Sequence, residues 1–188
     1  MNNSQVWINT GYELFAREGQ DGIQVERLAR LLGLNKSGFY HYFGNWEVYY
    51  KHLMQHHRTM VDLLIYDIQQ IDQFGTDYFF VLIKHSDTIM ANKQLIRNSH
   101  VNLFEQIFNE VTLKIDRATL TIWADYINKP NHPELAFRYL LIIRDLFYSR
   151  ISHSRLNVSY LDTLFSNAKN FLEEVSQLET AVLTLTDQ

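Results

Sequence analysis

Apolar residues recur at intervals of three and four along most of the chain, whereas strict alternation of apolar and polar residues is scarce. The first spacing places side chains on one face of an α-helix, and alternation is typical of a half-buried strand. Val25, Leu28, Ala29 and Leu32, for example, fall at positions i, i+3, i+4 and i+7. The pattern therefore predicts an all-α protein.

Glycines and polar capping residues divide the first part of the chain into short helices. Six of the seven glycines lie within the first 44 residues. We expect a helix over residues 4–17 that ends at the glycines of "REGQDG", and a second helix that stops at Gly33. A third helix begins at Asn35, a favourable N-cap residue, and closes at Gly44. This third helix is expected to bury three aromatic side chains: Phe39, Tyr42 and Phe43.

The rest of the chain predicts longer helices with fewer interruptions. A fourth helix begins at Trp46, directly after the capping residue Asn45. Both prolines lie in "NKPNHPE", which ends one helix and starts another at Pro133. The further helices are expected over residues 77–90, 92–110, 113–128, 133–151 and 158–178.

The second and third helices, joined by "LLGLN", form a helix-turn-helix pattern, in which glycine permits the sharp turn. In such a unit the second helix enters the major groove of DNA with its N-terminal residues toward the bases. With the aromatic stripe turned inward, the outward face carries Lys36, Ser37, Tyr40 and His41. These side chains offer hydrogen-bond donors and an aromatic edge to phosphates and base edges.

The run "GYELFAREGQDGIQVERLARLLGLNKSGFYHYFGNWEVYY" follows three linked patterns, with Gly11 in place of the alanine of the first and Trp46 in place of the lysine of the third: "A-x-x-L-F-x-x-x-G", "V-x-x-[IL]-A-x-x-x-G-[VL]" and "Y-x-[YH]-F-x-[SN]-K-E". Over Trp7 to Tyr50 the chain thus resembles the N-terminal DNA-binding domain of the TetR family of bacterial regulators. The resemblance implies a helix-turn-helix domain over residues 1–50 and a helical effector-binding and dimerisation domain over 51–188. It also implies a homodimeric repressor that binds a near-palindromic DNA operator and is released by a small-molecule effector.

The resemblance assigns roles to individual positions of the first domain. Lys36, Ser37 and Gly38 would approach the bases, Tyr40 and His41 would contact phosphates and base edges, and Gln24 would contact a phosphate at the start of the second helix. Three positions depart from the family pattern. Trp46 replaces a lysine, Gln24 replaces a threonine or serine, and Glu26 would repel phosphates unless it accepts a hydrogen bond from a cytosine amino group.

Charge changes this picture only slightly. The formal net charge is −4, and residues 1–60 hold six cationic side chains against five carboxylates. A weakly basic reading surface predicts a shallow salt dependence of DNA binding. Together with Trp46, it leaves open an alternative in which the helix-turn-helix contacts another protein and binds little DNA.

Effector binding, implied by the resemblance, needs apolar walls with a few polar points. Each aromatic residue taken singly is more often part of a core than of a pocket. The candidate pocket residues are Phe79, Ile83, His85, Arg97, His100, Phe104, Phe108, Trp123 and Tyr126.

The last two predicted helices carry apolar stripes wider than one intramolecular contact needs. By the resemblance, they form a four-helix interface across a two-fold axis. A monomeric bundle that buries both stripes internally is the alternative. The candidate interface residues are Tyr139, Ile143, Leu146, Phe147, Leu161, Leu164, Phe165, Ala168, Phe171 and Leu172.

Other classes of function have little support in the sequence. The chain has no cysteine, no phosphate-cradling glycine loop and no nucleophile elbow, so we do not expect an enzyme. His52 and His56 have the spacing of a helical zinc pair but no third ligand nearby in sequence, and no metal or cofactor is predicted. The longest apolar runs are too short to span a bilayer, which favours a soluble, cytoplasmic protein.

Overall fold

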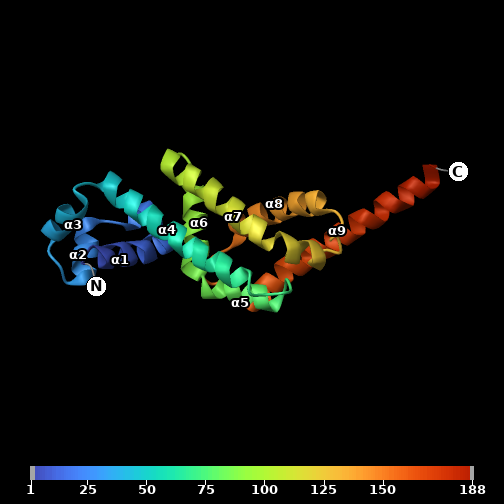
Figure 1. The fold of residues 1–188 in the computed structure, drawn as a ribbon, viewed down its shortest axis with the longest axis horizontal. Coiled ribbons are helices and arrows are strands. Elements are labelled where there is room, and N and C mark those ends of the chain that lie inside the picture. Colours follow the sequence, from blue (N-terminus) through green and yellow to red (C-terminus); the bar gives the residue numbers. More distant parts are fainter. Residues whose placement is uncertain (1–2, 187–188) are drawn as a thin grey trace. The chain divides into compact units, whose positions relative to one another are not determined.

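The computed structural model describes the backbone of residues 3–186 and the side chains of residues 4–175 and Gln177. Every regular element within this part of the chain is a helix, so the all-α prediction is confirmed (Figure 1). None of the described helices combines the length and apolar character that a bilayer-crossing segment needs. The elements are α1 (Asn3–Glu18), the 3-10 helix η1 (Gln20–Gly22), α2 (Val25–Leu32), α3 (Lys36–Phe43), α4 (Trp46–Ile68), α5 (Thr76–Lys84), α6 (Ser86–Arg97), α7 (Asn102–Tyr126), α8 (Pro133–Arg150) and α9 (Val158–Thr186).

The chain forms two compact units, and each unit is built from two separate stretches of sequence. The first comprises the chain up to Tyr66 together with Lys84–Ile115, and the second comprises Asp67–Ile83 together with the chain from Asp116 onward. Helices α4 and α7 each begin in the first unit and end in the second. The boundary expected at residue 50 falls inside the first unit, and as a functional division it stays a prediction.

Helix ends were predicted closely up to the start of α4 and for α8, and wrongly in the middle of the chain. Helix α9 also runs to Thr186 instead of ending at residue 178. The helix expected over 77–90 is two helices, because α5 ends at Lys84 and α6 begins at Ser86. This break lies where the chain passes from the second unit into the first. The helix expected over 92–110 is interrupted after Arg97, and α7 then runs unbroken to Tyr126.

Aromatic side chains from three helices form the core beside α3 in the first unit. The Phe39 ring is fully buried, and its centroid lies 5.8 Å from that of Trp7, 4.9 Å from that of Trp46 and 5.0 Å from that of Tyr49. The Tyr49 hydroxyl donates a hydrogen bond of 3.1 Å to the Trp7 carbonyl oxygen. These contacts hold α3 against α1 and α4, so α3 is presented on a rigid base.

The core of the second unit is built around Phe165 of α9. Its ring centroid lies 5.0 Å from that of Phe74, 5.6 Å from that of Phe79 and 6.2 Å from that of Phe147. The indole nitrogen of Trp123 donates to the Ala136 carbonyl oxygen over 3.0 Å, so this buried ring is also held by a polar contact.

Several positions expected at a dimer interface are buried within the single chain. The buried ones are Ile143, Phe147, Leu161, Leu164, Phe165, Ala168 and Leu172. A side chain buried within one chain has little surface left for a partner. Of the other candidates, Tyr139 and Leu146 are half-buried and Phe171 is exposed, and the interface stays a prediction.

Candidate nucleic-acid interface and neighbouring pocket

The turn between α2 and α3 is set by Gly33 and Asn35, as the sequence predicted. Gly33 has φ 65° and ψ 27°, a left-handed conformation that other residues adopt only with strain. The Asn35 side-chain oxygen then accepts a hydrogen bond of 3.2 Å from the Ser37 backbone N–H and caps α3. The first turn of α3 therefore begins at Lys36.

Helix α3 has one buried and one exposed face. Phe39 and Phe43 are buried, whereas Lys36, Ser37, Tyr40 and His41 are all exposed, as expected. The expected burial of Tyr42 is wrong, since Tyr42 is exposed and its ring packs beside those of its chain neighbours. The buried stripe is narrower than predicted because Phe39 and Phe43, four residues apart, already fill the space against α1 and α4.

Gln24 and Gly38 complete the predicted DNA-contacting set. Gln24 is the N-cap residue of α2, but its exposed side chain makes no capping hydrogen bond and is not committed to the helix end. A methyl group added to Gly38 would lie 3.6 Å from the Trp7 ring, which is an ordinary contact. Space inside the fold therefore does not require glycine at position 38.

Most cationic side chains of the first 60 residues are ion-paired. Lys36 lies 3.0 Å from Glu26, between Nζ and a carboxylate oxygen, and the other pairs are Arg17 with Glu13, Arg27 with Glu18, Lys51 with Glu47, and Arg58 with Glu110. Among the described residues of this stretch, Arg30 on the exposed side of α2 is a cation without such a partner. The reading surface is thus close to neutral, which fits the weak basic balance of the sequence.

Trp46 has a structural reason to replace the expected lysine. Its ring is half-buried and lies 4.9 Å from that of Phe39, 5.5 Å from that of Tyr49 and 5.8 Å from that of Tyr50, in a stacked arrangement with the last. A lysine would leave this aromatic corner between α3 and α4 unfilled. Trp46 therefore serves the packing of α3.

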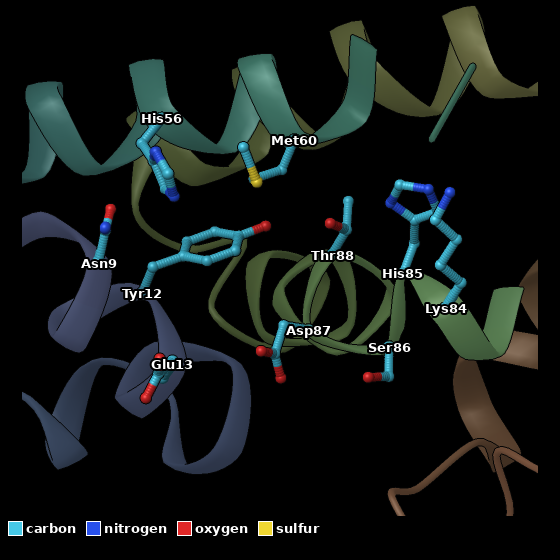
Figure 2. Close-up of a pocket in the computed structure, with 10 residues that line it drawn as sticks. All are labelled: Asn9, Tyr12, Glu13, His56, Met60, Lys84, His85, Ser86, Asp87 and Thr88. Carbon is cyan, nitrogen blue, oxygen red and sulfur yellow. The ribbon is translucent and has the colours of Figure 1, made fainter. Parts of the chain in front are cut away.

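A pocket of about 410 Å³ lies beside α1 in the first unit. Figure 2 shows the Tyr12 ring beneath His56 and Met60 of α4, with the carboxylates of Glu13 and Asp87 below it. The first residues of α6, preceded by Lys84 and His85, form the remaining wall. The lining combines an aromatic face with groups of both charges.

A hydrogen-bonded link between three helices lies next to this pocket. The Nε2 atom of His57 lies 2.9 Å from the Asn92 side-chain oxygen, and Nδ1 lies 2.7 Å from the Tyr12 hydroxyl. Since the amide oxygen only accepts, Nε2 carries the proton and the Tyr12 hydroxyl donates to Nδ1. Burial lowers the pKa of His57 to about 4, so the imidazole is neutral at pH 7.

Sequence reasoning missed this link, although part of its signal was present. His57 stands four residues after Leu53 and four before Val61, so it shares the buried face of α4. A histidine on such a face needs partners, but Tyr12 and Asn92 lie far away in sequence. Only the packing of α1 and α6 on α4 brings them together.

The predicted pocket residues are distributed between the two units. His85 lines the pocket of Figure 2, whereas Phe104 and Phe108 are buried in the first unit, and Arg97 and His100 are exposed there. The other four candidates belong to the second unit, where Phe79 and Trp123 are buried and Ile83 and Tyr126 are half-buried.

His52 and His56 do not belong to a larger ligand cluster. No group of three or more histidine, aspartate or glutamate side chains in the described part of the chain is placed to hold a metal ion. The two rings contact aromatic neighbours instead. His56 lies against Tyr12, with centroids 4.9 Å apart, and His52 lies against Phe43, with centroids 5.7 Å apart.

The capped turn between α2 and α3 and the exposed polar face of α3 are the geometry of a helix-turn-helix. Residues 8–47 match the family model of the bacterial regulatory proteins of the tetR family. Over this stretch the chain is similar to the DNA-binding domain of that family, and the match covers most of α1, all of α2 and α3, and the first two residues of α4. No curated protein and no solved structure matched the chain.

Proposed function

We propose that the protein represses transcription by binding a near-palindromic operator as a homodimer, and that a small-molecule effector releases it. The exposed face of α3 carries this proposal, because the Asn35 cap places Lys36 and Tyr40 at the end of the helix that enters the major groove. This function requires access to the chromosome, which we place in the cytoplasm, and it needs no catalysis.

Two exposed apolar side chains support the homodimer. Ile142 of α8 and Phe171 of α9 are largely exposed in the single chain. A second copy of the chain that packs on α8 and α9 would remove this apolar surface from water. A two-fold dimer presents two copies of α3 to the two halves of an inverted repeat.

The pocket beside α1 supports effector control. Its wall includes the Tyr12 ring, and the hydroxyl of the same residue bonds His57. An effector controls DNA binding only if it prefers one arrangement of the protein over another. We therefore place the effector here, where the occupant touches α1, the helix against which α3 packs.

The test is a selection of bound sequences from a random duplex pool at low salt, with the wild-type protein and the variants Lys36→Ala and Tyr40→Ala. We expect the wild type to recover an inverted repeat and each variant to lose it. Matched controls are Lys114→Ala, which removes another exposed and ion-paired lysine, and Tyr66→Ala, which removes another exposed tyrosine. Both controls should retain the repeat.

The second candidate function is a helix-turn-helix that contacts another protein. The paired cations near α3 and the packing role of Trp46 favour it, because both leave few free charges for phosphates. A folded, dimeric wild-type protein that selects no motif would support this candidate and contradict operator binding.

A further inference from the structure

One exposed ion pair connects the first turns of the two helices in the helix-turn-helix. Glu26 is the second residue of α2 and Lys36 is the first residue of α3. The Lys36 ammonium lies 3.0 Å from the Glu26 carboxylate, while 55% of the lysine side chain and 70% of the glutamate side chain remain exposed. The pair thus faces the solvent at the N-terminal end of α3, the end that a helix-turn-helix turns toward the bases.

Folding stability does not explain this pair. Exposed ion pairs contribute little to stability, because water and salt screen them. A carboxylate beside the reading face also repels the phosphates of DNA. The pKa of Glu26 is lowered, first by a backbone hydrogen bond and then by Lys36, so its negative charge persists at neutral pH.

The major-groove edge of a G·C base pair has the complementary pattern. Guanine presents the acceptors N7 and O6, and the paired cytosine presents the amino donor N4 next to them. An ammonium donor beside a carboxylate acceptor matches this order. In an A·T pair the carboxylate would face the thymine O4 acceptor, and in the reversed C·G pair both groups would meet atoms of the wrong kind.

We infer that Glu26 and Lys36 together read one G·C base pair in each half-site, with Lys36 donating to guanine and Glu26 accepting from cytosine. This inference rests on the proposed operator binding. Lys36 alone would donate to N7 of either purine. Glu26 supplies the discrimination against A·T. The 3.0 Å contact holds the ammonium and the carboxylate side by side, as the G·C edge requires, before DNA binds.

The test repeats the random-duplex selection with Glu26→Ala. Glu47→Ala is the matched control, because Glu47 pairs with Lys51 at 2.7 Å on α4 and is equally exposed, with 75% of its side chain accessible. We expect Glu26→Ala to lose the preference for G·C at one position of each half-site and to keep the rest of the motif. Glu47→Ala should keep the whole motif.

Defined duplexes then test the chemistry at that position. Replacing G·C by A·T should weaken wild-type binding by roughly tenfold or more and should weaken Glu26→Ala binding much less. Inosine keeps the major-groove edge of guanine and lacks only the minor-groove amino group. Replacing guanine by inosine should therefore leave the affinities of the wild type and of Glu26→Ala unchanged.

The possible failures are distinguishable. If Glu26→Ala binds every sequence more tightly and selects the wild-type motif, then Glu26 only restrains Lys36, and the inference alone is overturned. If the wild-type protein selects no motif at all, operator binding fails and the inference fails with it.

Discussion

The imidazole of His57 is fully buried and bonded at both ring nitrogens, to Tyr12 on one side and Asn92 on the other. The neighbouring charges that oppose its protonation are those of His56 and Arg58, and both act less strongly than burial. This one residue therefore couples folding to pH.

We predict that the free energy of unfolding falls as the pH drops from about 6.5 to about 4. Unfolded His57 binds a proton near its ordinary pKa of 6.5, whereas the folded protein resists protonation down to about 4. Between these two values, protonation of His57 stabilises the unfolded state relative to the folded state, and the free energy of unfolding falls by a total of about 3 kcal/mol. Urea unfolding at a series of pH values measures this, and His57→Gln should flatten the curve over the same interval. Parallel curves for the two proteins would assign the dependence to other groups.

At the scale of elements, Gly11 of α1 lies directly against the Tyr49 side chain of α4. A methyl group on Gly11 would lie 1.7 Å from the Tyr49 hydroxyl oxygen and 3.0 Å from the ring carbon that carries it. The first distance is impossible without movement, and the second is tight. Glycine at this position therefore allows α1 and α4 to pack together here, although glycine is a poor helix former.

We predict that Gly11→Ala destabilises the protein by about 1–3 kcal/mol, although alanine is the better helix former. Adding Tyr49→Phe removes the clashing hydroxyl and should restore part of the loss, despite breaking the hydrogen bond to the Trp7 carbonyl. Urea unfolding of the two single variants and the double variant measures the coupling. Simple additivity of the two losses would show that the hydroxyl is not the source of strain.

The elements that the sequence predicted well are those with local signals. Gly33 and Asn35 mark the turn before α3 by their own conformational preferences, so neighbouring residues suffice to place it. The break at His85 has no glycine or proline, and it coincides with the passage of the chain between units. The contact of Glu26 with Lys36 likewise depends on how two helices pack. Helix ends were therefore more predictable than the site contacts.

At the scale of the whole molecule, dimerisation has one sharp test in Phe171. Its side chain is 64% exposed on α9, and we propose that a second copy covers it. Phe171→Glu should give a folded monomer, with unchanged helical circular dichroism and a halved mass by sedimentation equilibrium, because a buried charge without a partner is costly. It should also lose operator affinity.

Phe80→Glu is the matched control for this variant, since Phe80 is 57% exposed on α5 and lies outside the predicted interface. It should behave as the wild type in both measurements. A Phe171→Glu protein that sediments with wild-type mass would exclude Phe171 from the interface.

The interleaved course of the chain through its two units also bears on how such genes exchange parts. Stretches of the two units alternate along the sequence. The chain passes from the first unit to the second within α4 and again within α7. A single genetic crossover between residues 67 and 115 would leave both units assembled from two different parents. A crossover at the end of α3, by contrast, exchanges the DNA-reading helices as one block and leaves the second unit intact. Recombination near residue 44 would therefore transfer the helix-turn-helix without mixing two parents in the second unit.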